Sequence, residues 1–365
     1  MTEGRIGDDR QVLALAQAIG GRVQRIQVRE RLIRTLGGRL INSFGLQAPW
    51  HGELYADSPL PDVMIAAGGR CASLARWVKQ ASGGKTKVVI IGRPWARLAD
   101  FDLVVTTPQY NLPARRNVQT NLLPLNSIET DPEDKRVREW RQRFAAPPGP
   151  WIGVLIGGDS GSFRMTEACA RRLAARLNTL AARTGGSLLL STSSRTPAAA
   201  IATLASHLSA PHHLHVWQPA QIDNPHAAIL ALSDRLVVTG ESASMIAEAV
   251  NTGKRVELFA LRERRLSRLL TRLPRALGLE WLMQLGAVLG YWTPPRDMHR
   301  LHAALAKAKS LGSDGAGILH PEDLRLVDRD LARTAARIRQ LLVAGPAEQT
   351  APLLALPAAL QGQSA

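Results

Sequence analysis

The first half of the chain alternates between short runs of continuous apolar residues and stretches with helical periodicity. Residues 71–80 place apolar side chains three and four positions apart, which predicts an amphipathic helix, and residues 12–19 predict another. Strands are predicted near residues 22–28 and at residues 63–67, 87–91 and 102–107. Continuous apolar strands that alternate with helices are typical of a parallel sheet covered by helices on both faces.

The same alternation restarts after a Pro/Gly-rich segment at residues 145–150. The sequence that follows predicts a complete doubly wound domain, with strands at 151–158, 187–192, 213–217, 235–240 and 255–261 and helices at 165–183, 197–208, 226–232 and 243–251. The chain beyond is mostly helical in its pattern and ends in a stretch rich in Ala, Pro and Gln.

The pattern therefore predicts an α/β fold of two doubly wound, Rossmann-like lobes with a helical C-terminal extension. We expect an N-terminal lobe at residues 1–146, a C-terminal lobe at 150–261, a helical extension packing across the lobes at 262–344 and a flexible tail at 345–365. Ligands of open parallel sheets bind beyond the carboxyl ends of the strands, so two lobes that face each other would line one interdomain cleft.

Composition and charge exclude several classes of protein. Hydrophobic residues make up 45% of the chain, too many for a disordered polyelectrolyte, and no run approaches the ~18 apolar residues that a transmembrane helix needs. The two cysteines, Cys71 and Cys169, cannot build a disulfide framework, which favours a reducing, cytoplasmic location. The net charge of +16 predicts an anionic partner, such as nucleotide phosphates or the inner membrane surface, where the protein would be peripheral. Alternatively, the scattered arginines reflect only a GC-rich genome.

The most informative loop follows the predicted strand at 151–158. It reads GGDSGS and contains the candidate ligand residues Gly157, Gly158, Asp159, Ser160 and Ser162. Glycines let a phosphate approach the backbone, serine hydroxyls donate hydrogen bonds, and the following helix N-terminus adds partial positive charge. The loop matches neither the P-loop nor the dinucleotide pattern. Asp159 would orient a hydroxyl or cap the helix, and the alternative for the whole loop is a tight turn without a ligand.

A second loop joins the predicted strand at 235–240 to the helix at 243–251. Its candidate ligand residues are Thr239, Glu241, Ser242, Ser244 and Glu248. Ser242 and Ser244 can donate to phosphate oxygens, and Glu248, on the helix face of Ser244, can accept hydrogen bonds from a ribose diol. The alternative is that Ser242 is only an N-cap with a glutamate in the first turn.

Other strand ends also carry polar residues. The loop STSSRTP offers Ser193 and Arg195 to a phosphate, and Pro197 suits the first position of the next helix. In the N-terminal lobe the turns after two strands contain Gly68, Gly69, Arg70 and Arg93, whose arginines would recognise an acidic acceptor or an anionic lipid headgroup. Solvated arginines are the alternative.

Several classes of site lack a signature in this sequence. His212, His213 and His215 form HHLH without a nearby acidic or cysteine ligand, so no metal is expected. The GxSxG elbow and the helix-turn-helix and RNA-binding signatures are also missing, so we expect no specific nucleic-acid partner.

Six blocks of the sequence resemble the mitochondrial-fission protein family, named for a plant protein whose loss elongates mitochondria. They lie in order between residues 4 and 258: GRIGDDRQVLALAQAIG, PDVMIAAGGRCA, VVIIGRPWARLADFDLVVTTPQYNLP, IGVLIGGDSGSFRMT, LLLSTSSRTP and ALSDRLVVTGESASMIAEAVNTGKRVEL. The family's pattern places a strand before the first block, where only three residues precede Gly4. Either the sequence begins too late or the first lobe lacks a central strand.

The second half is more distantly similar to GT-B glycosyltransferases, such as the lipid-II-forming N-acetylglucosaminyltransferase of peptidoglycan synthesis. The matching positions are Gly157, Gly158 and Ser160 in the first loop, and Ser242, Ser244 and Glu248 at the diphosphate and ribose end. The resemblance implies a donor site in the C-terminal lobe, an acceptor site in the N-terminal lobe, and a general base from the N-terminal lobe, with Asp8 and Asp9 as candidates. It implies no cofactor and no metal, because helix N-termini and basic groups stabilise the leaving diphosphate.

The leading hypothesis is a GT-B-type glycosyltransferase that moves a sugar from a nucleotide-diphosphate donor to an envelope or lipid-linked acceptor. The alternative is a non-catalytic, basic peripheral membrane or scaffold protein that keeps a GT-B-like shell. A sugar-nucleotide epimerase is disfavoured because the sequence has no YxxxK helix. If Glu248 binds ribose, Glu248→Ala should remove about 1.5–3 kcal/mol of binding and barely change folding; if it pairs with a surface arginine, neither should change.

Overall fold

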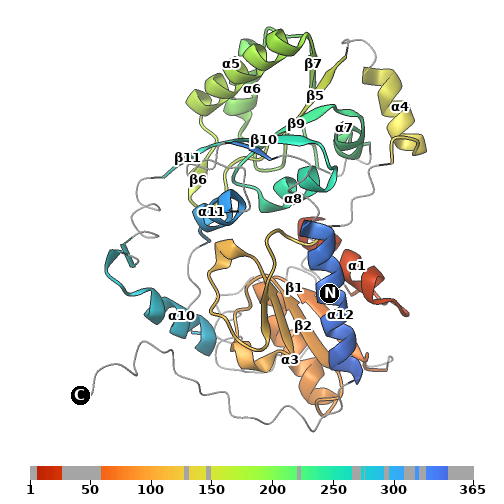
Figure 1. Ribbon diagram of the computed structural model, residues 1–365, viewed down its shortest axis with the longest axis vertical. Coiled ribbons are helices and arrows are strands. Elements are labelled where there is room, and N and C mark those ends of the chain that lie inside the picture. The colour runs from red at the N-terminus through yellow and green to blue at the C-terminus, as the bar shows by residue number, and fades with distance from the viewer. Residues whose placement is uncertain are drawn as a thin grey trace.

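The protein folds into two α/β lobes, one above the other in Figure 1. The computed structural model describes residues 6–26, 59–126, 131–144, 149–219, 223–264, 273–274, 276–291, 296–307, 317–319 and 326–343. The fold class predicted from the sequence, parallel α/β sheets followed by a largely helical C-terminal part, is confirmed.

The first lobe is built on a four-stranded parallel sheet of order β1-β2-β3-β4. Its strands are β1 (Val63–Ala67), β2 (Lys87–Ile91), β3 (Leu103–Thr106) and β4 (Val118–Thr120), with the short 3₁₀ helices η3 (Gly69–Cys71), η4 (Leu98–Asp100) and η5 (Pro108–Tyr110) after or between them. Alternate residues of each strand point to opposite faces, so Ile90 and Val104 enter one apolar core while Val89 and Val105 enter another. Both faces must therefore be covered.

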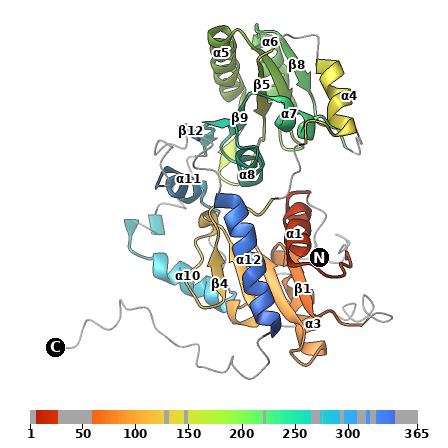
Figure 2. The same ribbon diagram turned by 45° about the vertical axis from the view of Figure 1, so that its right-hand side comes forward.

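Helices from distant parts of the sequence cover these two faces. Helix α3 (Ala72–Ala81) packs on one face through Leu74 and Val78. Helix α1 (Ile6–Ile19) and helix α12 (Leu326–Val343) pack side by side on the other, where Leu15 meets Ile338 in a common core (Figure 2). The end of the described chain thus completes the first lobe.

The second lobe has a six-stranded sheet of order β12-β10-β9-β5-β7-β8. Its elements are β5 (Trp151–Leu155), α5 (Glu167–Thr184), β7 (Ser187–Ser191), α6 (Ala198–His207), β8 (His212–His215), α7 (His226–Leu232), β9 (Arg235–Thr239), α8 (Ala243–Asn251), β10 (Arg255–Phe259) and β12 (Gly317–Leu319). All pairings are parallel except that of β12 with β10. Thr166 caps α5 by accepting a hydrogen bond from the Cys169 amide at 3.2 Å.

Several elements differ from the sequence-based expectation. Helix α4 (Lys135–Phe144) lies inside the predicted N-terminal lobe but buries Val137, Trp140 and Phe144 in the core of the second lobe, so the chain crosses over before the Pro-rich segment at 145–150. The part of the predicted strand at 22–28 that the structure describes, residues 22–26, has no strand, and residues 27–28 lie outside the described chain. Pro197 is the residue before α6 and not its first residue.

The extension after residue 261 contributes to both lobes. Besides β12 it contains β11 (Arg262–Glu263), which pairs with β6 (Phe163–Arg164), and the helices α10 (Glu280–Leu289), α11 (Met298–Lys307) and α12. Leu301 and Leu305 of α11 join the core of the second lobe, whereas Val288 of α10 packs against the first. The predicted tail at 345–365 lies outside the described residues. Among the helices that the structure describes, none is long and apolar enough to cross a membrane.

A buried polar network fastens α12 to the first lobe. The Thr334 hydroxyl is fully buried and accepts hydrogen bonds from Gln119 Nε2 at 2.6 Å and Asn121 Nδ2 at 3.2 Å, while donating to the Asp330 carbonyl. Thr334→Val keeps the shape of the side chain and leaves two buried amide groups without their acceptor. We expect a loss of about 1–3 kcal/mol of unfolding free energy in urea titrations. Thr334→Ser, which keeps the hydroxyl, is the control, and equal stability of the valine variant and the wild type would contradict this account.

Candidate functional site

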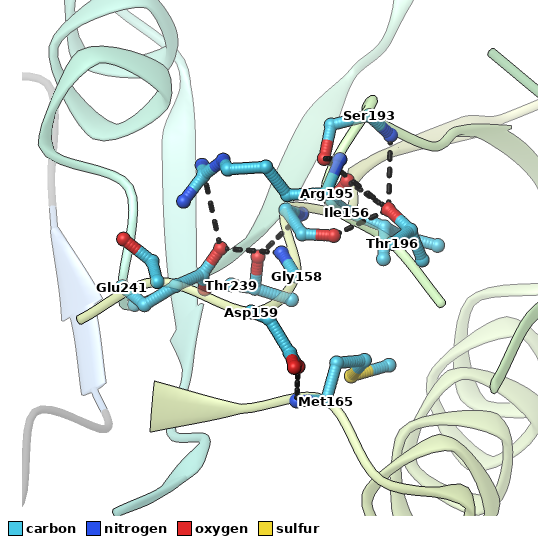
Figure 3. Close-up of polar contacts among 12 residues, drawn as sticks. Ile156, Gly158, Asp159, Met165, Ser193, Arg195, Thr196, Thr239 and Glu241 are labelled. Carbon is cyan, nitrogen blue, oxygen red and sulfur yellow. Dashed lines mark hydrogen bonds and ion pairs between the residues drawn. The ribbon is translucent and has the colours of Figure 1, made fainter. Parts of the chain in front are cut away.

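Three loops of the second lobe meet at the carboxyl ends of β5, β7 and β9, and a buried glutamate lies between them (Figure 3). Glu241, which follows β9, is 0% exposed. Its Oε1 accepts a hydrogen bond from the Gly158 amide at 2.8 Å, and the neighbouring Gly157 amide donates to Thr239 Oγ1 at 2.8 Å. The two loops singled out from the sequence therefore contact each other directly.

The close approach of these loops requires the paired glycines. A Cβ atom on Gly157 would lie 1.6 Å from Glu241 Oε1, and one on Gly158 would lie 2.0 Å from the backbone oxygen of Arg195. Neither position has room for any side chain. The GG pair thus permits a backbone contact with a carboxylate, the same approach to an anion that the sequence predicted for a phosphate.

Arginine side chains supply positive charge to this site. Arg195 Nη2 lies 3.8 Å from Glu241 Oε1, and Arg296 Nη2 donates to the Glu241 carbonyl at 2.6 Å and to Ser160 Oγ at 3.3 Å. Burial lowers the pKa of Arg195, the charge of Glu241 opposes that shift, and Arg296 adds to it. One guanidinium group thus lies near the buried carboxylate of Glu241 and a second contacts the backbone of the same residue.

The Glu241 carboxyl group is poorly stabilised as an anion. Burial raises its pKa above the ordinary value, and Arg195, the local amide groups and the Thr239 hydroxyl oppose that shift without cancelling it. Its second oxygen, Oε2, is buried and has no hydrogen-bond partner among the described residues. Groups able to bind an anion therefore surround a side chain whose own charge is costly.

The N-terminus of α8 lies next to Glu241 and faces the first lobe. Ser242 precedes the helix but makes no capping hydrogen bond through its side chain. A Cβ on Gly7 would lie 3.0 Å from Ser244 Oγ, so the first turn of α1 lies against the first turn of α8. This contact brings Asp8 and Asp9, both in the first turn of α1, to the lobe junction. One oxygen of Asp9 is buried without a hydrogen-bond partner among the described residues.

Glu248 makes a connection between the lobes that the sequence did not reveal. Its Oε1 accepts from Arg10 Nη1 of α1 at 2.6 Å, and its Oε2 contacts His226 Nε2 of α7 at 2.7 Å. Burial alone would raise the pKa of Glu248, but the hydrogen bonds and charges of His226 and Arg10 hold it below its ordinary value. Each oxygen of Glu248 thus has a partner within the protein, and the ribose contact stays a prediction.

The remaining candidates of the first loop differ in what their side chains contact. Asp159 Oδ1 accepts from the Met165 amide at 3.0 Å and its Oδ2 pairs with Arg164 at 3.0 Å, so Asp159 orders the approach to α5 without capping it. Ser160 faces Arg296, and Ser162 is buried. In the third loop, Ser193 Oγ and Thr196 Oγ1 contact each other at 3.2 Å.

The acceptor candidates lie at the strand ends of the first lobe. The Gly68 amide donates to the Ile91 carbonyl at 3.2 Å, and a Cβ on Gly69 would lie 2.7 Å from the Trp95 ring, so both glycines have packing roles. The Arg93 guanidinium lies 5.8 Å from the centre of the Tyr110 ring. The Arg70 side chain lies outside the described residues.

A short segment before α11 connects these strand ends to the second lobe. The Asp297 amide donates to the Gln109 carbonyl at 2.8 Å, next to Tyr110 in η5, while the preceding residue, Arg296, contacts Glu241 and Ser160. The strand-end loops of the two lobes are therefore joined through residues 296–297. An interdomain cleft between them stays a prediction.

Sequence reasoning missed four residues of this region: Arg10, Thr196, His226 and Arg296. Thr196 was inside a loop that the sequence identified, and its hydroxyl contacts the Gly157 carbonyl. Arg296 follows Pro294-Pro295 in a segment with no recognisable pattern, and only its contacts reveal it. Within the described parts of the chain, no group of three or more His, Cys, Asp or Glu residues could hold a metal ion.

Comparison with known proteins identifies a matching family model and two relatives. The profile described as Mitochondrial fission ELM1 matches residues 6–285. Mitochondrial fission protein ELM1 of Arabidopsis thaliana is 30% identical over 224 residues, covering 55% of this chain, and the chain spans only 51% of that protein. Uncharacterized protein RP120 of Rickettsia prowazekii (strain Madrid E) is 23% identical over 71% of this chain and 82% of its own length.

Solved structures whose chains follow a similar path share little sequence identity with this protein. UDP-GlcNAc 2-epimerase from Neisseria meningitidis, bound to UDP-GlcNAc, is 13% identical with a TM-score of 0.44 over 93% of this chain and 90% of its own. MurG of Acinetobacter baumannii is 14% identical with a TM-score of 0.35 over 84% of this chain and 98% of its own.

The Glu248 contacts predict a structural effect that the sequence-based expectation did not include. Glu248→Gln weakens an ion pair and a hydrogen bond at a buried position, and we expect it to lower the unfolding free energy by about 1–3 kcal/mol at neutral pH. Because the folded-state pKa of Glu248 lies below the ordinary 4.5, this stabilisation is complete above that pH and is lost as the pH falls further.

Thermal unfolding of the wild type and Glu248→Gln across a pH series measures this difference. Glu139→Gln, at an exposed position of α4, is the matched control and should leave stability unchanged. A difference between wild type and Glu248→Gln that does not shrink in acid would contradict the inter-lobe ion pair.

Proposed function

We propose that this chain, which belongs to the mitochondrial fission ELM1 family, transfers a sugar from a nucleotide-diphosphate donor to an envelope or lipid-linked acceptor. The observation that carries this proposal is the anion site around Glu241. It combines the Gly158 amide, two arginines and an adjacent helix N-terminus at the carboxyl edge of a parallel sheet.

In this proposal the donor diphosphate takes the position of the Glu241 carboxylate. The Gly158 amide and Arg195 would then turn from Glu241 to phosphate oxygens, and Arg296 and the first turn of α8 would add positive potential. Such groups stabilise the charge that develops on the diphosphate as the bond to the sugar breaks. The costly charge of Glu241 favours this exchange.

The acceptor and the base would come from the first lobe. A carboxylate of α1, Asp9 or Asp8, would take the proton of the acceptor hydroxyl as that oxygen attacks the anomeric carbon. The bond from the anomeric carbon to the diphosphate oxygen breaks, and the nucleoside diphosphate leaves. Asp9 is the stronger candidate because one of its oxygens is buried and has no described partner. Arg93, at the end of β2, would bind an anionic group of the acceptor.

Binding of sugar nucleotides tests the donor site directly. Thermal shift and calorimetry with UDP-, GDP-, ADP- and CMP-linked sugars should identify at least one ligand. Arg195→Ala should weaken its binding about ten- to hundredfold, since a charge-assisted hydrogen bond contributes about 1.5–3 kcal/mol. Glu241→Gln keeps an acceptor for the Gly158 amide but removes the competing charge, and should tighten binding about tenfold.

Arg183→Ala, on the exposed last turn of α5, is the matched control for the loss of one positive charge. Two results would contradict the proposal: no shift with any sugar nucleotide for the folded protein, or equal loss of affinity in Arg195→Ala and Arg183→Ala.

The carboxylates of α1 predict a separation of binding from turnover. Asp9→Asn should leave the affinity for the donor within twofold, by our estimate of about 0.4 kcal/mol at most, and lower kcat about 10²–10⁴-fold. The measurement is release of nucleoside diphosphate with a membrane lipid extract as the acceptor source. Asp8→Asn in parallel shows which carboxylate acts. An unchanged kcat in both variants would show that neither carboxylate of α1 acts as the base.

A specific observation favours a second candidate, a non-catalytic scaffold that keeps the two-lobe shell. The amides of Gly157 and Gly158 already have internal acceptors, Thr239 and Glu241, so the loop is satisfied without a ligand. In that case Glu241→Gln would change stability without creating nucleotide affinity. The same binding measurements therefore separate the two candidates.

A further inference from the structure

Helix α10 has its apolar side turned outward. Twelve large hydrophobic residues are exposed among those described, and eight of them lie between residues 273 and 291. On the helix itself, Trp281, Leu282, Leu285 and Leu289 are 53%, 45%, 45% and 39% exposed. Their spacing of three and four residues places them on one side of the helix. A surface helix normally shows the opposite arrangement, with its polar side in water.

The other side of α10 fixes the helix to the first lobe. Ala287 is buried, and Val288 packs against the core that α3 covers. Gly290 ends the helix at a φ of 76°, and a Cβ there would lie 2.6 Å from the Arg97 backbone nitrogen, in the loop after β2. Glu280 forms an ion pair with Arg300 of α11. The outward residues are therefore presented by an anchored helix (Figure 1).

We name the α10 apolar face as Leu277, Trp281, Leu282, Leu285, Leu289 and Tyr291, all exposed. No acidic residue belongs to it, since the acidic residue of α10, Glu280, is paired with Arg300. Contiguous exposed apolar surface of this kind marks an interaction site with a protein or a membrane. The charge of the surrounding chain decides between these partners.

The sequence directly before α10 is strongly basic. Residues 262–275 contain six arginines and one glutamate, a net charge of +5, and the whole chain carries +16. Two of these arginines, Arg262 and Arg264, lie in the described part and are exposed. An apolar helix face with Trp and Tyr that follows a basic stretch in the sequence is typical of a helix that lies in the interface of an anionic bilayer.

We propose that the α10 apolar face docks this protein onto an anionic membrane surface. The aromatic residues Trp281 and Tyr291 would enter the headgroup region, and the leucines would bury their side chains at the acyl boundary. A second copy of the chain is the less favoured occupant, because pairing would bring together two molecules of charge +16.

The position of α10 connects docking with the proposed acceptor side. Gly290 contacts the loop after β2 at Ala96 and Arg97, three and four residues beyond Arg93. Docking through α10 would hold that loop close to the bilayer, where a lipid-linked acceptor would be found. This connection rests on the proposed function, whereas membrane docking itself does not require sugar transfer.

Vesicle co-sedimentation of the full chain tests the proposal. The vesicles are phosphatidylcholine alone and phosphatidylcholine mixed with phosphatidylglycerol. We expect binding to the mixed vesicles that weakens with salt, and at least a tenfold loss of that binding in Leu282→Gln/Leu285→Gln. The matched control is Leu342→Gln/Val343→Gln, which alters two exposed apolar residues of α12. Arg262→Glu/Arg264→Glu should weaken binding to the mixed vesicles only.

Folding and nucleotide binding provide separate readouts. The α10 double variant should keep the melting temperature, because the altered side chains are already exposed, and should keep any thermal shift with sugar nucleotides. Failure of the proposed function would therefore leave the vesicle result intact. Equal vesicle binding by the α10 variant and the wild type would overturn the proposal. The proposal would also be overturned if the wild type did not bind vesicles and light scattering showed that the wild type self-associates while the α10 variant does not.

Discussion

The approach of a buried carboxylate to two adjacent glycines organises the centre of this protein. Glu241 comes within hydrogen-bond distance of the Gly158 amide only because residue 157 has no side chain, and the missing side chain of Gly158 makes room for the Arg195 backbone. That contact joins the loop after β5 to the loop after β9, and Arg195 brings in the loop after β7. Burial makes the charge of Glu241 costly, and in the proposed function the donor diphosphate would take the place of this carboxylate at the same atoms.

Helix α8 couples this centre to the first lobe. Its N-terminus lies beside Glu241, its first turn touches Gly7 of α1, and its Glu248 binds Arg10 and His226. A ligand that enters between α8 and α1 must therefore change contacts that also hold the lobes together. Binding and the relative position of the lobes are linked by these few groups, whichever of the two candidate functions holds.

The C-terminal part uses its apolar residues in two different ways. Helix α12 lies beside α1 and buries Ala335 and Ile338 on the first sheet, where it covers an apolar face of the strands. Helix α10 buries only a narrow side and leaves its leucines and Trp281 exposed. Both helices are rich in apolar residues, and only their packing shows that one completes a core and the other leaves an apolar surface exposed.

Much of the local structure was determined by the sequence itself. Strands such as β2 and β7 are fully buried in parallel sheets, and such strands consist of continuous apolar runs that are recognisable without any tertiary information. The loops after β5, β7 and β9 were identified for the same reason, since their Gly, Ser and Thr residues directly follow a recognisable buried strand. The packing of α4 on the second lobe and of α12 on the first could not be predicted. An amphipathic pattern indicates that a helix buries one side, but it does not indicate which core that side joins.

The partners of individual polar residues were decided by the tertiary structure alone. Glu248 was identified as a functional candidate by its position on α8, but its partners Arg10 and His226 are 238 and 22 residues away in sequence. Arg296 reaches Glu241 from a segment without any pattern. Apolar burial follows from local periodicity, whereas an ion pair depends on which surfaces the folded chain brings within a few ångströms, and that is a property of the whole fold.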